Sequence, residues 1–498
     1  MVSISDLTLQ NPWWIHSTDI NDPKLEEYKR SKFRWVPRIK NKINLDEEGI
    51  YVIRGPRRIG KSTLLRLMIK EALDNGVEPK NIFFWSCDNV NNRSELHDIL
   101  RIYLEWAGPK GHKLLFIDEV TFIEDWELAY KSIFEELGLS NKTFIFTGSS
   151  SRDLKTGVER LPGRKGKTGR SQIIFMPMKF SEYINLVDKE LYANLVNVWS
   201  IKGEFNSNLS YPTKQLHELL LNPKYHGERI KIINGMLPFK NQLDKHLEDF
   251  FLSGGIIKPI NEIKTEGKIQ NYTYEMYIEW VLGDIARFKL SDKTAKNLIR
   301  SLIDNLSNSI GWQALCKNSG IKEERTVMEY SDMLNSIFLI NYLEKLDLNK
   351  FRPAFRSNKK FYFTSSFFYM AFKTYLQNPA ANYFIESKKM LTNPEVKSKL
   401  IEQVVCDHLT RLAYSLVPSD IFDPKDLLFY SALGKEIDFV LKNQESFVAF
   451  EVKYQNSINS EDYKELDKFN GLRYLISKDE FLPNKTITVP ISIFLMLI

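Results

Sequence analysis

Buried strands and amphipathic helices alternate through the first third of this sequence. Short apolar runs predict strands at Ile50–Arg54, Asn81–Ser86, Lys113–Val120 and Lys142–Ser150. Apolar residues at helical spacing predict intervening helices that end near Leu73 and span Leu96–Trp106 and Trp126–Leu137. Strands that alternate with helices in this way predict an α/β domain built on a parallel sheet.

The pattern changes after about residue 290. Leu298, Leu302 and Leu306 have helical spacing, and a further helix, a turn at Gly320 and a second helix follow. This succession predicts a helix-turn-helix, with the strand of a wing beginning near Ile337. Such modules bind DNA in some proteins and only pack against neighbouring elements in others. The second helix carries few basic residues, so both alternatives stay open.

The last hundred residues return to a mixture of helix and strand. The sequence predicts an amphipathic helix at Leu400–Leu409 and strands at Phe429–Ser431, Glu436–Leu441 and Phe447–Lys453. The apolar stretch Ile491–Ile498 is too short to cross a bilayer, and it predicts a buried final strand.

The most informative motif follows the first predicted strand. It reads G-x-x-x-x-G-K-S from Gly55 to Ser62 and leads into a helix, which is the setting of a phosphate-binding loop (P-loop). Its glycines let successive N–H groups turn toward an anion, Lys61 can reach the β and γ phosphates, and the Ser62 hydroxyl can bind magnesium. The sequence therefore predicts ATP or ADP and Mg²⁺ as ligands. The expected nucleotide contacts are Gly55, Pro56, Arg57, Arg58, Ile59, Gly60, Lys61, Ser62, Thr63, Asp118 and Thr147.

Two carboxylates end the third predicted strand. Asp118 and Glu119 follow four apolar residues, at the strand end where a parallel sheet faces its ligand. Asp118 can hold magnesium through water, and Glu119 can act as the base that polarises the attacking water. The fourth strand ends in hydroxyls at Thr147–Ser150, which either sense the γ phosphate or cap the next helix.

A second set of charged residues lies near the C-terminus. Asp438 comes early in one predicted strand, and Glu451 and Lys453 lie on one face of the next strand, because side chains alternate along a strand. Asp438 and Glu451, with Glu402 from the preceding helix, could share a magnesium ion, and Lys453 could stand near the water or the scissile phosphate. Such a site would cleave a phosphodiester with the help of the metal. The alternative is a related domain that does not cut.

Composition narrows the classes of protein. A formal charge of +6 permits a nucleic-acid partner without requiring one. The three cysteines Cys87, Cys316 and Cys406 are widely separated, so they fit a reducing compartment and form neither a disulfide framework nor a zinc site. The N-terminus lacks the pattern of a signal peptide. We therefore expect a cytoplasmic protein with no membrane partner.

These motifs resemble the Walker A, Walker B and sensor-1 elements of AAA+-related ATPases. Leu161–Arg164 and Met176–Tyr183 resemble the "GR … P-x-x-F-x-E" segment of archaeal and bacterial ATPases whose C-terminal half carries a restriction-endonuclease-like PD-(D/E)XK domain. The resemblance implies that Arg164 is an arginine finger or sensor, although this basic loop could equally contact nucleic acid or only be solvated. A finger that acts on a neighbouring copy would require a ring, so a hexamer and a monomer are both open.

The resemblance also implies five parts. They are a P-loop ATPase core with an N-terminal arm (1–185), a helical lid (186–290), a winged helix-turn-helix (291–350), a connector (351–394) and an α/β restriction-endonuclease-like domain (395–498). The implied catalytic residues are Lys61, Glu119 and Arg164 in the core and Asp438, Glu451 and Lys453 in the last domain. The expected function is ATP hydrolysis coupled to work on DNA, with a metal-dependent nuclease at the C-terminus. The alternative is a regulatory switch ATPase whose C-terminal domain binds nucleic acid or a partner without cleaving.

Overall fold

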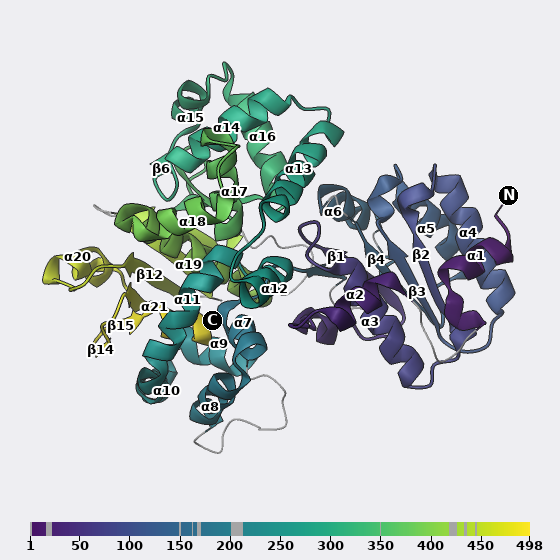
Figure 1. Cartoon of the computed structure of the whole chain (residues 1–498), viewed down its shortest axis with the longest axis horizontal. Helices are drawn as coiled ribbons and strands as arrows, with labels where there is room; N and C mark the ends of the chain where they lie inside the picture. The colour runs from purple at the N-terminus through teal and green to yellow at the C-terminus, as the bar shows by residue number, and fades with distance from the viewer. Residues whose placement is uncertain are drawn as a thin grey trace. The chain divides into compact units, whose positions relative to one another are not determined.

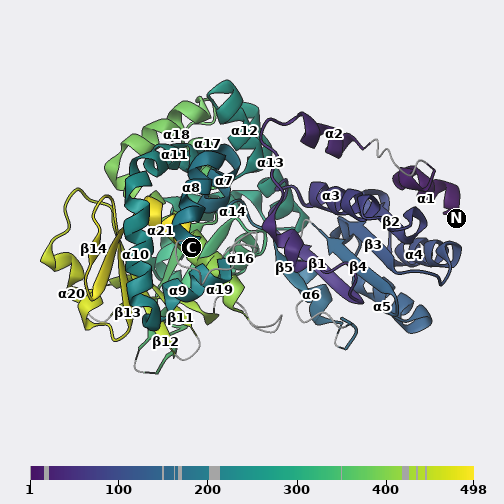
Figure 2. The same ribbon diagram turned by 90° about the horizontal axis from the view of Figure 1, so that it is seen from below.

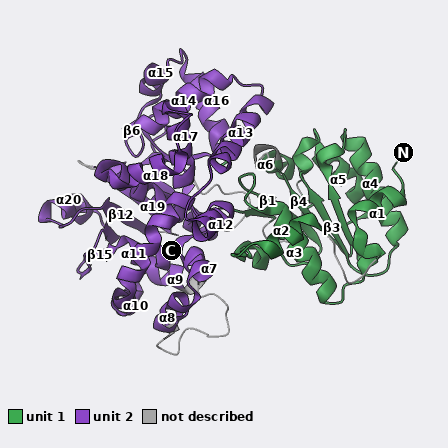
Figure 3. Cartoon of the chain, in the orientation of Figure 1, with its two compact units in different colours: residues 1–176, 336–338 green, residues 177–335, 339–498 purple. Residues whose placement is uncertain are grey.

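The chain forms two compact units (Figure 3). Unit 1 holds residues 1–176 and 336–338, and unit 2 holds residues 177–335 and 339–498. None of the helices in the described parts of the chain is long and apolar enough to cross a membrane. The computed structural model describes residues 2–15, 22–148, 151–161, 163–166, 171–200, 213–348, 350–417, 426–432, 436–443 and 446–498.

Unit 1 is built on a sheet of five parallel strands in the order β2-β3-β4-β1-β5 (Figure 1). The strands are β1 Gly49–Arg54, β2 Ile82–Ser86, β3 Lys113–Asp118, β4 Lys142–Thr147 and β5 Gln172–Ile174. The four apolar runs thus form the four expected strands, and β5 adds a fifth beside β1. Because the strands are parallel, their carboxyl ends share one edge of the sheet, and the P-loop, Asp118 and Thr147 all lie at that edge.

Helices cover both faces of this sheet (Figure 2). One core packs α1, α4, α5 and α6 against Val52 and Ile117, and the other packs α2 and α3 against Ile53 and Phe116. Successive residues of one strand therefore enter opposite cores, which is why these strands are continuous apolar runs. The helices are α1 Ile4–Gln10, α2 Pro23–Arg30, α3 Lys61–Asp74, α4 Arg93–Ala107, α5 Trp126–Leu137 and α6 Ser151–Glu159.

The N-terminal arm completes the outer edge of β2. The side-chain amide of Asn11 accepts from the N–H of Phe84 at 2.6 Å and donates to the carbonyl of the same residue at 3.0 Å. The indole N–H groups of Trp13 and Trp14 both donate to the carbonyl of Ile82, at 3.0 and 2.9 Å. An edge strand otherwise presents backbone groups without partners, so the arm is part of the core of unit 1.

Unit 2 begins with a helical region. In the described residues of the segment expected to be a lid, 186–290, the chain forms the α-helices α8 to α13. The helix before them, α7, ends just inside this segment. The helices are α7 Phe180–Val187, α8 Lys189–Ser200, α9 Thr213–Leu221, α10 His226–Met236, α11 Lys240–Ser253, α12 Ile257–Glu266 and α13 Asn271–Arg287.

The next segment alternates helices with short strands. The two helices expected around the turn at Gly320 are α15 and α16, and Gly320 ends α15 in the left-handed conformation with φ of +69°. Strand β9 pairs antiparallel with both β6 and β7. The elements are α14 Asp292–Asp304, β6 Ser309–Ile310, α15 Trp312–Ser319, α16 Glu324–Ser336, β7 Ile340–Asp347, β8 Arg352–Pro353 and β9 Lys359–Phe363.

One mixed sheet runs through unit 2 in the order β14-β15-β13-β12-β11-β10-β7-β9-β6. Strand β7 of the preceding segment pairs in parallel with β10, with Glu344 beside Phe429. Helix α19 packs on β9, β10, β11 and β12 of this sheet. The elements of this sheet that follow in the chain, with the helices between them, are α19 Pro394–Leu416, β10 Leu428–Ala432, β11 Glu436–Asn443, β12 Ser446–Lys453, α20 Ser460–Lys468, β13 Leu472–Ser477, β14 Leu482–Pro483 and β15 Thr486–Pro490.

The residues expected to be a connector, 351–394, do not form a linker. They contain β9, which lies between β7 and β6 in the shared sheet, and the helices α17 Ser366–Gln377 and α18 Tyr383–Thr392. Two lysines of β9 are buried, since Lys359 and Lys360 are only 2% and 1% exposed. Lys359 is paired with Glu344 at 2.7 Å, so its charge is neutralised inside the fold.

The last element is a helix, α21 Ile491–Leu497, where the sequence predicted a strand. All seven of its side chains are buried, because it packs against α7, α9 and α11 as well as against β13 and β15. A short run that is apolar on every side fits a buried strand and a buried helix equally well, so the pattern alone could not decide.

The contact between the arm and β2 can be tested by substitution. We expect Asn11→Ala to lower the free energy of unfolding by about 1–3 kcal/mol, because it leaves both backbone groups of Phe84 buried without partners. Urea denaturation of the full chain measures this. Leu9→Ala, on the same helix and 83% exposed, is the control and should change the value by less than about 0.5 kcal/mol. Equal values for the two variants would show that the arm does not stabilise the edge.

Candidate functional site

The P-loop connects β1 to α3, and its backbone requires both glycines. Gly60 has a φ of +106°, and a Cβ on Gly55 would lie 2.0 Å from the carbonyl oxygen of Phe175. Gly60 is also the N-cap of α3 and has no side chain with which to cap the helix. The first N–H groups of α3 therefore need another acceptor, which is the property of an anion-binding helix end.

Lys61 begins α3 and is only 4% exposed. Its Nζ donates to the carbonyl oxygens of Gly55 at 3.0 Å and Pro56 at 2.8 Å. These acceptors are neutral, and a phosphate in the loop would offer the ammonium a charged acceptor, which forms a stronger hydrogen bond. Of the other predicted contacts, Pro56 and Ile59 are buried, Arg57, Ser62 and Thr63 are half-buried, and Arg58 is exposed.

Thr147 links the two predicted carboxylates of unit 1. Its Oγ1 donates to Oδ1 of Asp118 and accepts from the backbone N–H of Glu119 at 3.3 Å. Glu119 has a left-handed backbone, with φ of +55°, and its Oε2 is buried without a hydrogen-bond partner among the described residues. A buried carboxylate oxygen without a donor is an open acceptor for a water molecule or a ligand. Ser149 and Ser150 lie outside the described residues.

The residues at this edge fit a magnesium ion. Asp118 is 1% exposed, with Oδ1 held by Thr147 and Oδ2 4.0 Å from Nζ of Lys24 on α2. This second oxygen therefore already faces a cation. Carboxylate and hydroxyl oxygens are the ligands that magnesium prefers, so Asp118 and Ser62 have the required chemistry.

The structure does not bring Arg164 to the P-loop. Its guanidinium pairs with Glu135 near the end of α5 at 2.9 Å, and its carbonyl accepts from the Tyr130 hydroxyl at 2.7 Å. Gly166 forms a bridge with Gly49, the first residue of β1, whereas the P-loop follows the last residue of β1. Arg164 thus lies near the opposite edge of the sheet, and this position does not fit the expected action on the phosphates of its own chain.

In unit 2 the structure brings together the four predicted residues of the C-terminal site. Glu402 comes from α19, Asp438 from β11, and Glu451 and Lys453 from β12. The N–H of Asp438 donates to Oε2 of Glu451 at 3.2 Å, and Nζ of Lys453 donates to Oε1 at 2.5 Å. Oδ2 of Asp438 accepts from the N–H of Val452 at 2.9 Å. The helix and the hairpin therefore place these side chains as the sequence pattern predicts.

Lys360, which sequence reasoning missed, lies between these acids. This lysine of β9 places Nζ 2.8 Å from Glu402, 2.8 Å from Glu436 and 3.0 Å from Asp438. Lys360 lies between Lys359 and the aromatic run Phe361–Phe363 of β9, and a lysine directly before such a run could have indicated a buried charge. We call Lys360, Glu402, Glu436, Asp438, Glu451 and Lys453 the charge cluster.

Burial shifts the protonation of the charge cluster. Burial first, and then repulsion from Asp438, raises the pKa of Glu402 to about 7 and that of Glu451 to about 8. Burial alone would lower the pKa of Lys360, but Asp438, Tyr362, Glu402 and Glu436 together raise this pKa well above its ordinary value. The ammonium of Lys360 therefore keeps its charge at neutral pH.

The charge cluster differs from the predicted magnesium site. Among the residues that the structure describes, no group of three or more His, Cys, Asp or Glu side chains is placed to hold a metal ion. The physical reason is that N–H and ammonium donors already occupy oxygens of the expected ligands Glu402, Asp438 and Glu451.

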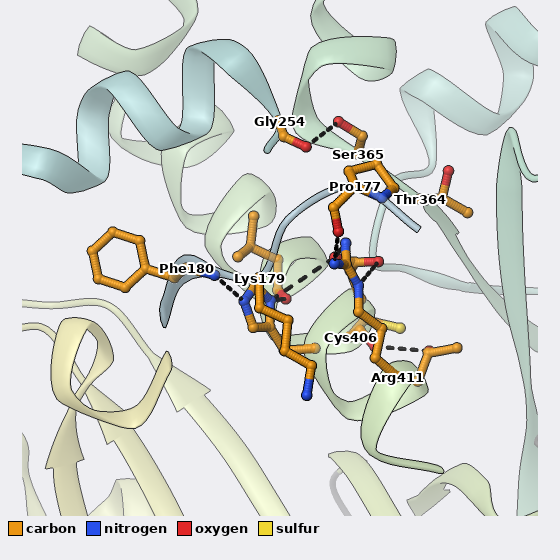
Figure 4. A network of polar contacts seen from close by, with 12 residues as sticks. Pro177, Lys179, Phe180, Gly254, Thr364, Ser365, Cys406 and Arg411 are labelled. Carbon is orange, nitrogen blue, oxygen red and sulfur yellow. Dashed lines mark hydrogen bonds and ion pairs between the residues drawn. The ribbon is translucent and has the colours of Figure 1, made fainter. Parts of the chain in front are cut away.

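The first residues of unit 2 are fixed on α19 (Figure 4). The N–H of Phe180 donates to Nε2 of His408 at 3.0 Å, and Nδ1 of His408 faces the carbonyl of Val404 at 2.8 Å. Arg411, which is paired with Asp407, donates to the carbonyl of Pro177. Burial and then the charge of Arg411 lower the pKa of His408 well below its ordinary value. The imidazole is therefore neutral, as acceptance from Phe180 requires.

Comparison with protein families matches two separate stretches of the chain. Residues 47–184 match an AAA domain, and residues 397–492 match a domain of unknown function. An uncharacterized protein of Haemophilus influenzae is 22% identical over 420 residues, which cover 82% of this chain and 84% of that protein.

Several solved structures are similar in part. They include the Walker-type ATPase of Pyrococcus abyssi (15% identity, TM-score 0.35, covering 70% of this chain and 93% of that one). The ORC1 protein of Aeropyrum pernix in complex with DNA is 12% identical with a TM-score of 0.30, and the match covers 74% of this chain and 94% of that one. RuvB of Thermotoga maritima is 14% identical with a TM-score of 0.24, and the match covers 68% of this chain and 89% of that one. None of these TM-scores reaches 0.5, so what those proteins bind does not bear on this chain.

The family match covers the parallel sheet, the P-loop and the Asp118–Glu119 pair. Residues 47–184 are therefore similar to an AAA domain over the stretch that holds the P-loop.

Proposed function

We propose that this chain binds ATP with magnesium in its AAA domain and hydrolyses it. The observation that carries the proposal is the hydrogen bonding of Thr147 to both Asp118 and Glu119. The Thr147 hydroxyl thus positions two neighbouring carboxylates: Asp118, which suits a metal ion, and Glu119, which suits the role of general base. Hydrolysis of a phosphoanhydride needs these two groups at separate positions beside the phosphates.

Each residue of the site has a separate role in this proposal. Lys61 would leave the carbonyls of the P-loop for the β and γ phosphates. Asp118, through water, and Ser62 would hold magnesium, which neutralises phosphate charge when bound. Glu119 would accept the proton of the attacking water, since its buried Oε2 has no other donor in the described structure.

The arginine finger and the assembly stay predictions. Because Arg164 is held by Glu135 near the other edge of the sheet, it would have to act on the phosphates of a neighbouring copy. A hexamer would allow this action, and a monomer would not.

Two substitutions separate nucleotide binding from hydrolysis. We expect Lys61→Ala to lose ATP binding in calorimetry, because no other ammonium would take its place in the loop. Glu119→Gln should keep binding but lower the rate of phosphate release about 10²–10⁴-fold, because the amide cannot accept a proton. Lys70→Ala is the control, since Lys70 lies on the same helix and pairs only at the surface with Asp74. Turnover by Glu119→Gln at the wild-type rate would contradict the proposal.

The positioning role of Thr147 can be tested on its own strand. Thr147→Val keeps the shape of the side chain but removes the oxygen that orients Asp118 and Glu119, so we expect turnover about 10–100-fold lower. Thr143→Val is the matched control on β4, where Thr143 donates to the carbonyl of Glu47 at 2.7 Å, away from the nucleotide edge. Equal rates for both variants would show that the Thr147 oxygen has no role in hydrolysis.

We propose further that the C-terminal domain binds DNA without cutting it. The gathering of Glu402, Asp438, Glu451 and Lys453 supports a nuclease-like site, but Lys360 among these acids favours the alternative without cleavage. DNA as the partner is supported by the net charge of +6. It is also supported by the order α14-β6-α15-α16-β7-β9, which suits a winged helix.

Plasmid nicking distinguishes the two alternatives for the C-terminal domain. We expect supercoiled DNA incubated with the full chain and Mg²⁺ or Mn²⁺ to be nicked no faster than with Lys453→Ala, because the acids are already neutralised. Metal-dependent nicking that Lys453→Ala abolishes would instead establish the nuclease.

A further inference from the structure

Lys360 satisfies its whole bonding capacity inside the charge cluster. An ammonium has three N–H donors, and three carboxylates lie within 2.8–3.0 Å of its nitrogen: those of Glu402, Glu436 and Asp438. The hydroxyl of Tyr362, on the same face of β9, donates to the same oxygen of Glu402 at 2.6 Å. Since Lys360 is 1% exposed, water contributes little to the solvation of this charge.

Donors also occupy both oxygens of Asp438 and both oxygens of Glu451. Oδ2 of Asp438 accepts from the N–H of Val452. Glu451 accepts from the N–H of Asp438 on one oxygen and from Lys453 on the other. Magnesium requires about six oxygen ligands at about 2.0–2.1 Å in a nearly octahedral arrangement. A metal ion would therefore compete with these donors for the same oxygens.

A metal ion and the Lys360 ammonium also exclude each other electrostatically. The nitrogen stands between Glu402 and Asp438, 2.8 and 3.0 Å from their oxygens, in the space that a metal shared by these acids would occupy. Two like charges at such a separation repel strongly in a buried environment. The ammonium is covalently attached to β9, which pairs with a strand on either side, so it does not diffuse away from the carboxylates as a free ion would.

We infer that Lys360 is the resident cation of the charge cluster: its ammonium takes the position of a divalent metal between Glu402 and Asp438 and keeps Mg²⁺ and Mn²⁺ out of the C-terminal domain. The inference rests on the proposed binding without cleavage and gives that function a physical cause. It also means that the domain contains a latent metal site, which removal of one ammonium would open.

Manganese binding by the full chain without nucleotide tests the inference. Electron paramagnetic resonance of free Mn²⁺ would be compared for the wild type, Lys360→Met and the double variant Lys360→Met/Asp438→Asn. We expect Lys360→Met to bind one further Mn²⁺ with an affinity at least about tenfold above the wild type, and the double variant to lose this gain. Any binding by the AAA domain is common to all three proteins and cancels in the comparison.

Lys359→Met is the matched control. Lys359 is the neighbouring residue, is 2% exposed, and pairs with Glu344 outside the charge cluster. Its loss removes a buried ion pair but opens no set of acids, so we expect no gain in Mn²⁺ binding. Thermal unfolding gives a second readout, because Mn²⁺ should raise the Tm of Lys360→Met and leave that of Lys359→Met unchanged.

Three outcomes separate the inference from the function on which it rests. No gain of Mn²⁺ by a folded Lys360→Met protein overturns the inference and leaves binding without cleavage intact. Binding of Mn²⁺ by the wild type that Asp438→Asn abolishes also overturns it, and this arm holds even when Lys360→Met does not fold. Metal-dependent DNA nicking by the wild type overturns the proposed function itself.

Discussion

Both units of this protein must supply hydrogen-bond acceptors to buried cations. An ammonium or guanidinium removed from water costs several kcal/mol unless acceptors surround it. Lys61 meets this need with carbonyls of its own loop, and Lys360 meets it with carboxylates. Arg229 and Arg473, 0% and 2% exposed, use backbone carbonyls at the ends of helices. The acceptor decides what the cation can do, since neutral carbonyls yield readily to a phosphate and carboxylates do not.

One short stretch of chain crosses the boundary between the two units at residues 176 and 177. In unit 1 the carbonyl of Phe175 lies where a side chain on Gly55 would stand, so this residue closes the back of the P-loop. In unit 2 Pro177 and Phe180 are fixed by Arg411 and His408 of α19. Within unit 2, the residues that follow this boundary are therefore held by the helix that carries Glu402. The P-x-x-F-x-E pattern in the sequence marks this anchorage.

Apolar patterning predicted unit 1 well because parallel strands are buried on both faces. Val52 and Ile53 enter different cores, so both faces of β1 are apolar and the sequence alone predicts a buried strand there. The P-loop and the Asp118–Glu119 pair were also predictable, since local spacing fixes them. The role of Lys360 was not predictable, because the sequence alone does not show that this lysine is enclosed by acids from two other elements, α19 and β11. The helical form of α21 was not predictable for a similar reason, because the close packing around this segment is tertiary.

The parallel pairing of β7 with β10 has a mechanical consequence. Backbone hydrogen bonds run from the strand after α16, through β10 and β11, to the hairpin that carries Asp438 and Glu451. These strands thus form one continuous sheet. A hinge between the segment with α15 and α16 and the C-terminal strands would have to break the backbone hydrogen bonds between β7 and β10. The strand that follows α16 and the strands that carry the charge cluster are therefore expected to move together, without a hinge between them.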